Sequence, residues 1–168
     1  MTGAPRHTHT AAYQARLVVR NALFGLPAHF DPALVPRVIF TDPEIAEVGL
    51  TEPMLHRAKR GNLNVLRLSF AENDRARAER QTYGLVKLVT DRGGRLLGAG
   101  IVGTGAGEMI SLFAFAIANG LSMRHFLNYV APYPTLADIA VGLAAEFAAQ
   151  QPPSPWLRRL MALNRLLP

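Results

Sequence analysis

Two alternating segments joined by a short glycine turn constrain the fold more than any other feature of the sequence. Residues 83–91 alternate between two faces, as a half-buried strand does, and residues 95–102 form a second apolar segment. Between them lies Asp91-Arg92-Gly93-Gly94, where the glycines supply the positive φ that a tight turn needs. Two strands joined by so short a connection must be antiparallel. The sequence therefore predicts an antiparallel sheet and excludes a doubly wound parallel one.

The other periodic segments add strands to this hairpin and place helices around it. Extended segments are predicted at residues 37–41, 45–50 and 64–69, and helices at residues 8–24, 51–60, 106–120, 122–127 and 135–149. Thr8 or Thr10 is expected to cap the first helix. Phe113, Phe115 and Leu143 are the expected core residues of the later helices. Because strands dominate the first half and helices the second, we expect an α+β domain with its helices packed on one face of the sheet.

The composition limits what the folded chain can bind. The 168 residues include 18 Lys and Arg against 12 Asp and Glu, a net charge of +6, and no Cys. Half of that charge excess comes from three arginines beyond residue 150, where no acid occurs. The first 150 residues are thus close to balanced and do not present the clustered basic face of a nucleic-acid-binding protein. We expect no nucleic-acid partner, no disulphide framework and no thiol chemistry in this chain.

Residues 99–121 resemble a membrane-spanning segment only superficially. Glu108 is their one charged residue, but the glycines at residues 103–107 divide the segment into a strand, a turn and a helix. The apolar helical run, residues 109–118, is about half of the roughly 20 residues that a bilayer requires. We expect a buried helix there and a cytoplasmic protein, since no secretory signal pattern is seen.

The same glycine cluster does not have the spacing of a phosphate-binding loop. Residues 103–107 match neither G-x-G-x-x-G nor G-x-x-x-x-G-K-[ST], so a tight strand-to-helix turn is the preferred interpretation. His7-x-His9 has a metal-like spacing, but capping or tag-like roles fit it better, and no metal site is predicted. Spacing alone therefore defines no catalytic constellation.

Residues 151–168 read as a separate unit of the sequence. Pro152, Pro153 and Pro155 form a hinge before a predicted amphipathic basic helix at residues 156–167. Two interpretations stay open. The helix could lie on an acidic membrane surface with Trp156 at the interface, or it could dock on this chain or a partner with its arginines toward water. We favour the second, so membrane association is not expected.

Residues 35–52, VPRVIFTDPEIAEVGLTE, carry a long motif of the form P-x-x-x-[FY]-T-x-P-E-x-A-x-V-G-x-[TS]-E. Further motif segments follow in a fixed order: FAENDRA at 70–76, GLVKL at 84–88, LGA through Glu108 at 97–108, and PYPT with Asp138 at 132–138. The helical segment THTAAYQA precedes them at residues 8–15. Together they resemble the C-terminal dimerisation domain of the pyridine nucleotide–disulphide oxidoreductases, in the branch of mercuric reductase and dihydrolipoamide dehydrogenase. The resemblance covers residues 7–150.

The resemblance implies a division of the chain and a set of roles. Residues 1–34 resemble the end of the FAD domain, residues 35–150 the dimerisation domain, and residues 151–168 are the added basic helix. In the family this domain forms a two-fold interface and lends a His–Glu pair to the partner's active site, while FAD and NAD(P) domains and a redox Cys pair precede it. Here Tyr133 occupies the His slot and Asp138 the Glu slot. A phenol is a poor base at neutral pH but can donate a hydrogen bond.

The resemblance also places Thr8 and His9 near the flavin, because the free N–H groups of a helix N-terminus favour electron-rich atoms. We therefore expect a homodimer in an FAD- and NAD(P)-dependent oxidoreductase, with Tyr133 and Asp138 acting across the interface. The chain alone is expected to bind FAD poorly and to be inactive. Two alternatives are kept: an independent small-ligand-binding domain with a pocket at the turn of residues 103–108, and an interaction module docking through the basic C-terminal helix.

Overall fold

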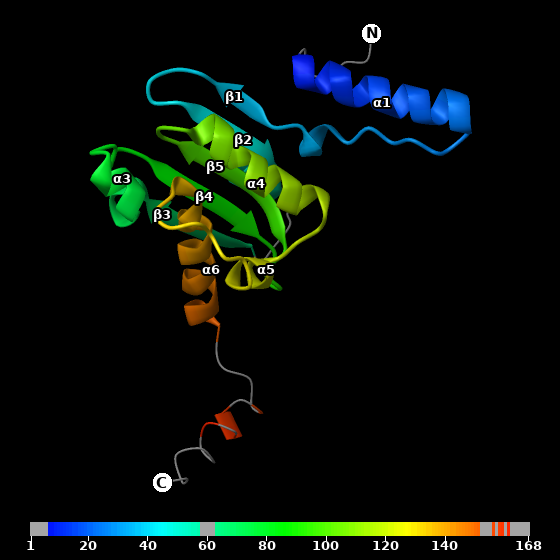
Figure 1. Ribbon diagram of the computed structural model, residues 1–168. Coiled ribbons are helices and arrows are strands. Elements are labelled where there is room, and N and C mark those ends of the chain that lie inside the picture. The colour runs from blue at the N-terminus through cyan, green and yellow to red at the C-terminus, as the bar shows by residue number, and fades with distance from the viewer. Residues whose placement is uncertain (1–6, 58–62, 152–155, 157, 160, 162–168) are drawn as a thin grey trace.

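The computed structural model describes residues 7–57 and 63–151, together with Trp156, Arg158, Arg159 and Met161. At its centre is a five-stranded antiparallel sheet in the order β1-β2-β5-β4-β3 (Figure 1). Its strands are β1 (Arg37–Ile39), β2 (Ile45–Gly49), β3 (Asn64–Ser69), β4 (Leu85–Thr90) and β5 (Leu96–Val102). All of the pairings are antiparallel. The predicted class of sheet is thus confirmed.

The turn between β4 and β5 is built as its sequence predicts. Gly94 has a φ of 83°, and the Asp91 side chain accepts a hydrogen bond from the backbone nitrogen of Arg95 at 2.9 Å. The far side of β5 lies against β2, where Gly98 is paired with Gly49. A Cβ on Gly98 would stand 2.0 Å from the carbonyl oxygen of Leu50. Glycine at this position is therefore what allows the chain after β2 to approach β5.

α4 and α6 pack on one face of the sheet, in agreement with the predicted α+β class. The helices of the domain are α1 (Thr8–Phe24), α2 (Glu52–Arg57), α3 (Asp74–Ala78), α4 (Ala106–Ala118), α5 (Met123–Leu127) and α6 (Ile139–Gln150), with short 3-10 turns η1 (Pro32–Leu34), η2 (Phe70–Glu72) and η3 (Leu136–Asp138). α4 packs on β2 and β5, α6 packs on β3, and α5 packs on α6. The helix predicted at residues 135–149 is divided into η3 and α6.

The core lies between the sheet and these helices. Phe113 of α4 is 1% exposed and meets Phe126 of α5 with ring centroids 6.0 Å apart, and Leu143 of α6 is fully buried. The assignment of Phe113 and Leu143 to the core is confirmed. The assignment of Phe115 is wrong, because 65% of Phe115 is exposed. Residues two apart on a helix face different sides, and α4 is apolar nearly all round, so its sequence pattern does not reveal which side is covered.

The other face of the sheet carries a charged row. Arg37, Glu47, Gly100, Lys87 and Arg67 are paired in register across all five strands. Arg37 bonds Glu47 at 2.8 Å, and Lys87 bonds Glu52 of α2 at 2.5 Å. Such a row is typical of a sheet face in contact with water rather than with a second layer.

α1 stands apart from the sheet (Figure 1). His9 Nε2 lies 2.9 Å from the carbonyl oxygen of Pro36, and the rings of Tyr13 and Phe30 are 6.0 Å apart. The predicted threonine caps are wrong: His7 is the N-cap residue, and no side chain caps α1. Thr8 is already helical, and Thr10 is buried within the first turn.

Some predictions fall on parts of the chain outside this description. The end of the helix predicted at residues 51–60 lies beyond Arg57, and most of the predicted C-terminal helix at residues 156–167 is likewise outside the described residues. Within the described ranges, no helix is long and apolar enough to span a bilayer. The segment 99–121 is divided between β5 and α4, as its glycines predict.

Candidate functional site

Two motifs about 60 positions apart in the sequence meet at one surface. The Tyr133 hydroxyl donates a hydrogen bond to Asp74 Oδ2 at 2.8 Å, across 59 residues of chain. Beside it, the Asn73 side-chain nitrogen donates to the carbonyl oxygen of Thr135 at 3.1 Å. The PYPT loop is therefore attached to the start of α3 at two points.

Local capping fixes the α3 side of this junction. Asn73 is 5% exposed, and its Oδ1 accepts a hydrogen bond from the backbone nitrogen of Ala76, which makes it the N-cap of α3. Because its nitrogen bonds the loop while its oxygen caps the helix, one amide serves both segments. On the loop side, the Thr135 hydroxyl donates to the carbonyl oxygen of Pro132 at 2.7 Å.

Tyr133 itself is 71% exposed, with its ring outside the core. The hydrogen bond to Asp74 raises its pKa above the ordinary tyrosine value of 10.0, and the negative charges of Asp74 and, more distantly, Asp138 act in the same direction. The phenol is thus held in its neutral form at neutral pH. Asp138 is the last residue of η3 and the N-cap residue of α6, but its side chain makes no capping hydrogen bond. Asp74, and not Asp138, is the direct partner of the hydroxyl.

A groove of about 490 Å³ runs beside this junction. It is lined by residues of α3, the turn before α4, α4 itself and η3, among them Arg75, Glu79, Glu108, Met109, Leu112 and Leu136. Met109, Leu112 and Leu136 are apolar residues of this lining, and Arg75, Glu79 and Glu108 are its charged residues. Arg75 is paired with Glu79. The groove can accept an apolar group with a polar or cationic end.

The turn of residues 103–107 is not an anion site, because a carboxylate of the chain already occupies the helix N-terminus that follows it. Glu44 Oε2 accepts a hydrogen bond from the backbone nitrogen of Gly107 at 2.8 Å. A Cβ on Gly103 would stand 2.6 Å from the ring of Phe70. The interpretation as a tight strand-to-helix turn is confirmed.

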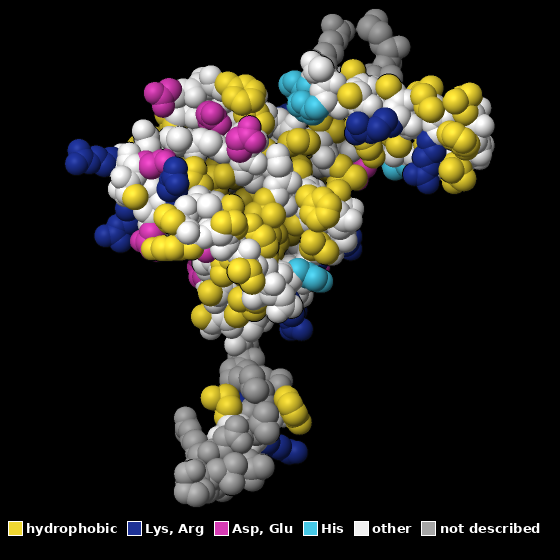
Figure 2. Space-filling view, in the orientation of Figure 1, with side chains coloured by type: hydrophobic (Ala, Val, Ile, Leu, Met, Phe, Trp, Pro, Cys, Tyr) yellow, Lys and Arg dark blue, Asp and Glu magenta, His cyan; other side chains and the backbone are white. Residues whose placement is uncertain are grey.

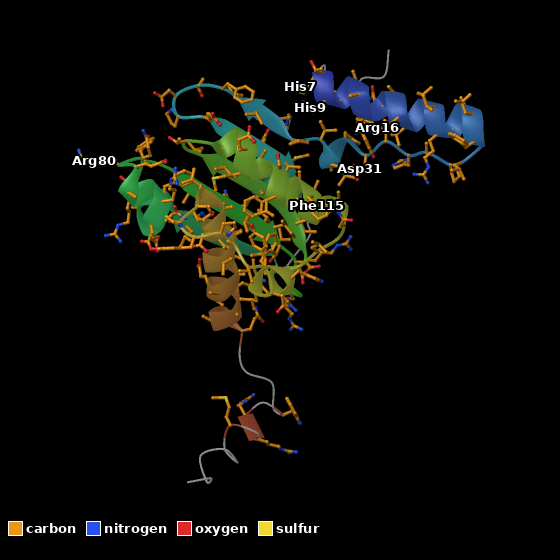
Figure 3. The ribbon with its side chains drawn as sticks, viewed as in Figure 1. His7, His9, Arg16, Asp31, Arg80 and Phe115 are labelled. Atoms are coloured by element: carbon orange, nitrogen blue, oxygen red, sulfur yellow. The ribbon has the colours of Figure 1, made fainter. Side chains whose placement is uncertain are left out.

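Thr8 and His9 lie at the N-terminus of α1 (Figure 3). The rings of His7 and His9 are stacked, with centroids 5.2 Å apart. Among the described residues, no hydrogen bond, ion pair or ring contact links them to Tyr133 or Asp138. Within those ranges, no group of three or more His, Cys, Asp or Glu side chains is arranged to hold a metal ion. The four predicted site residues therefore form two separate groups in one copy of the chain.

Sequence reasoning identified Tyr133 and Asp138 but assigned no role to Asp74 or Asn73. Both belong to the motif at residues 70–76, and their positions at a helix start predict capping. Capping accounts for Asn73 Oδ1. The contact of Asp74 with Tyr133 cannot be recognised in the sequence around either residue, because it forms only when two segments 59 residues apart come together in the fold.

The fold agrees with comparisons to known proteins. Residues 35–144 match the family described as pyridine nucleotide-disulphide oxidoreductase, dimerisation domain. This match covers most of the chain, and the chain belongs to that family. It contains β1 to β5, both sides of the junction of Asp74 with Tyr133, and the first half of α6.

Among individual proteins, the chain is 40% identical over 148 residues to a mercuric reductase from Streptomyces lividans. It is 35% identical over 151 residues to a dihydrolipoyl dehydrogenase from Bacillus subtilis. These alignments cover 87% and 88% of this chain but 31% of each relative. The chain thus spans about a third of the length of these relatives.

This chain also matches about a third of the length of similar solved structures. LpdA from Mycobacterium tuberculosis superposes with a TM-score of 0.80 at 27% identity, covering 86% of this chain and 32% of LpdA. RclA from Escherichia coli, an HOCl-induced flavoprotein disulphide reductase, superposes with a TM-score of 0.74 at 26% identity, covering 86% of this chain and 33% of RclA. Both similarities extend over most of this chain.

Proposed function

We propose that this chain forms the two-fold interface of a homodimeric pyridine nucleotide–disulphide oxidoreductase and completes the partner subunit's active site through Tyr133. The observation that carries the proposal is the exposed Tyr133 hydroxyl, held by Asp74 on a loop that is fastened to α3. An exposed aromatic side chain with a fixed hydroxyl is suited to contact a group outside its own chain. Its separation from Thr8 and His9 supports action on a second copy.

In this proposal Tyr133 acts as a positioning group rather than as a base: its one proton is donated to Asp74, and its oxygen can accept a hydrogen bond from the partner's site. Its raised pKa keeps the proton on the phenol at neutral pH. An imidazole in the same slot would exchange a proton near pH 7, which a phenol does not do. Asp138 contributes negative charge beside Tyr133. The reaction of the complete enzyme therefore need not involve proton transfer at residue 133.

The residues at the N-terminus of α1 fit a flavin. The first-turn N–H groups of a helix have no partners within it, and here no side chain caps them and no acid stands in the first turn. Thr10 Oγ1 is buried and has no hydrogen-bond partner among the described residues. Thr8 and His9 would hold an electron-rich edge of FAD there. When bound, FAD supplies electron transfer between a pyridine nucleotide and a disulphide.

We also propose that the complete enzyme is cytoplasmic.

Light scattering of the purified chain at several concentrations, with an absorbance scan, tests this proposal. We expect a colourless dimer that persists at low micromolar concentration, with no redox activity of its own. A monomer at every concentration would contradict the proposed role in dimer assembly. Yellow protein would contradict the expectation that this chain binds FAD poorly by itself.

The groove beside Met109 supports a second candidate function, an independent small-ligand-binding domain. Its lining combines apolar side chains with one more acid than base, since Glu79 is paired with Arg75 and Glu108 adds a second carboxylate. This combination favours a hydrophobic amine. Titration with tryptamine, followed by the amide resonances of α4, tests this candidate. Saturable shifts confined to the groove would support it, and unchanged resonances would oppose it.

Docking through residues 156–167 stays a prediction, since most of that segment lies outside the described residues.

A further inference from the structure

One buried side chain joins the two segments that meet at Tyr133. Asn73 is 5% exposed, and the two ends of its amide have different partners. Its Oδ1 accepts a hydrogen bond from the backbone nitrogen of Ala76 at 3.0 Å, while its Nδ2 donates to the carbonyl oxygen of Thr135 at 3.1 Å. Asn73 is therefore bonded both to α3 and to the PYPT loop, across 62 residues of chain.

The second bond between these segments is exposed to water. Asp74 accepts from the Tyr133 hydroxyl at 2.8 Å, but the Asp74 side chain is 55% exposed and Tyr133 is 71% exposed. Figure 2 shows acidic and basic side chains gathered over α3. An exposed hydrogen bond competes with water at both ends, whereas breaking a buried one leaves an unsatisfied donor or acceptor. The bond from Asn73 is thus the stronger of the two attachments.

The loop transmits the position of Thr135 to Tyr133. Only Pro134 separates the two residues, and the proline ring fixes its own φ. Tyr133 precedes this proline, so its backbone is restricted as well. The Thr135 hydroxyl also donates to the carbonyl oxygen of Pro132 at 2.7 Å, on the other side of Tyr133. Tyr133 therefore moves together with Thr135.

On the α3 side, the amide is anchored in the core. The backbone nitrogen of Asn73 donates to the carbonyl oxygen of Phe70 at 3.0 Å. Phe70 and Ala76, the residues bonded to Asn73 within this segment, are both fully buried. Because a close-packed core leaves such residues little room to move, the Asn73 amide is a fixed point for the loop.

We infer that Asn73 is the positioning residue for Tyr133: its amide nitrogen holds the PYPT loop where the Tyr133 hydroxyl reaches Asp74. The inference rests on the proposed role of Tyr133 in the partner's active site and names the residue that sets its position there. Asn73 acts through Thr135. The exposed bond between Tyr133 and Asp74 then forms as a consequence of the buried one.

Asn73→Ser separates the two ends of the amide. Serine is as good a helix N-cap as asparagine, so the Ala76 N–H keeps its acceptor, but the serine side chain is too short to bond Thr135. Asn64→Ser is the matched control, because Asn64 Nδ2 donates to the carbonyl oxygen of Asp91 at 3.1 Å, a bond of the same kind and length. Circular dichroism checks the fold of both variants. Asn73→Thr keeps the cap in the same way and is the second variant if Asn73→Ser does not fold.

The titration of Tyr133 is the readout, followed by tyrosinate absorbance and assigned with Tyr133→Phe. In Asn73→Ser we expect the pKa of Tyr133 to shift down toward 10.0, because the hydroxyl no longer reaches Asp74. In Asn64→Ser it should keep its wild-type value. Asp74→Ala added to Asn73→Ser should cause little further shift, because both changes break the same bond.

Three results would overturn the inference. With an unchanged titration in Asn73→Ser, the loop holds Tyr133 without the amide. With equal shifts in Asn73→Ser and Asn64→Ser, the titration follows a general loss of stability. With a full further shift on adding Asp74→Ala, the hydroxyl was still bonded to Asp74.

The proposed function fails by a different measurement. A monomeric wild-type chain in light scattering overturns the homodimer, and with it the role of Tyr133 in a partner's site. The titration alone decides whether Asn73 positions Tyr133.

Discussion

Glu44 and Gly107 join two parts of the fold that are 63 residues apart: the Glu44 carboxylate accepts the backbone N–H of Gly107 at 2.8 Å. The backbone oxygen of Glu44 also accepts from the nitrogen of Gly103 at 2.9 Å. The loop between β1 and β2 is thus fixed on the N-terminus of α4, where a negative charge is favoured by the helix dipole. This contact gives the Glu of the TDPE motif a structural role.

We predict that Glu44→Ala lowers the free energy of unfolding by about 1–2 kcal/mol, the usual cost of removing a helix cap. Glu44→Gln keeps an acceptor and should cost less. Urea denaturation measures both. Glu47→Gln is the control, because the pair of Glu47 with Arg37 is solvent-exposed and should contribute less than about 1 kcal/mol. Equal losses for Glu44→Ala and Glu47→Gln would contradict the capping role.

Two glycines of β5 should respond in opposite ways to the same substitution. A Cβ on Gly98 would meet the carbonyl oxygen of Leu50 at 2.0 Å, whereas a Cβ on Gly100 would meet nothing within 4 Å. Gly98→Ala should therefore destabilise the domain by about 3 kcal/mol or more through overpacking. Gly100→Ala should be neutral or slightly stabilising. Thermal unfolding of both variants tests this, and a tolerated Gly98→Ala would show that β2 can move away from β5.

Arg80 is the one residue other than glycine with a positive φ, 58°, in the described part of the chain (Figure 3). It follows α3, where Gln81 N bonds the carbonyl oxygen of Ala76 at 2.8 Å. A left-handed backbone conformation costs a residue other than glycine about 1–2 kcal/mol. Glycine avoids this cost but loses more backbone entropy on folding, so the net gain in stability from a glycine here is smaller.

We therefore predict that Arg80→Gly raises the unfolding free energy by about 0.5–1 kcal/mol. Arg77→Gly, inside α3, should lower it by up to about 1 kcal/mol. Chemical denaturation of the pair distinguishes a backbone effect from the loss of an arginine charge, since both variants lose one. A loss of stability in Arg80→Gly would contradict the prediction.

The hydrogen bond between Tyr133 and Asp74 predicts a raised pKa for the Tyr133 hydroxyl. Its pKa should lie above 10.0 and fall toward that value in Asp74→Ala, as followed by tyrosinate absorbance. Tyr133→Phe should remove this titration, which assigns it to Tyr133. Because the folded state holds the proton more tightly, the contribution of this group to stability is present below pH 10 and is lost as the pH rises through the raised pKa. An unaltered titration in Asp74→Ala would contradict the pairing.

The sheet could be predicted because its signals are local. The alternation of residues 83–91 and the turn at Asp91–Gly94 specify a hairpin without reference to the rest of the chain, and the structure has it. The strand at residues 64–69 and the first helix at 8–24 also have the predicted bounds. The ends of the other predicted strands differ from the observed ends by one or two residues.

The tertiary relationships could not be predicted in this way. The sequence pattern of α4 gave no reason to separate Phe113 from Phe115, because both are apolar in an apolar helix. Likewise, Thr8 and Thr10 are good capping residues by type, but α1 begins at Thr8 and has His7 as its N-cap, so both threonines already lie within the helix. The partner of Tyr133 belongs to a segment 59 residues away.

The two bonds from α3 to the PYPT loop have a consequence for how the site assembles in time. Asn73 and Thr135 are separated by 62 residues, and β4, β5 and α4 lie between them in the chain. Closing so long a loop costs entropy that only the intervening structure offsets. We therefore expect Tyr133 to reach its position after the sheet and α4 have formed, so that a nascent chain fastens its PYPT loop only once most of the domain has been synthesised.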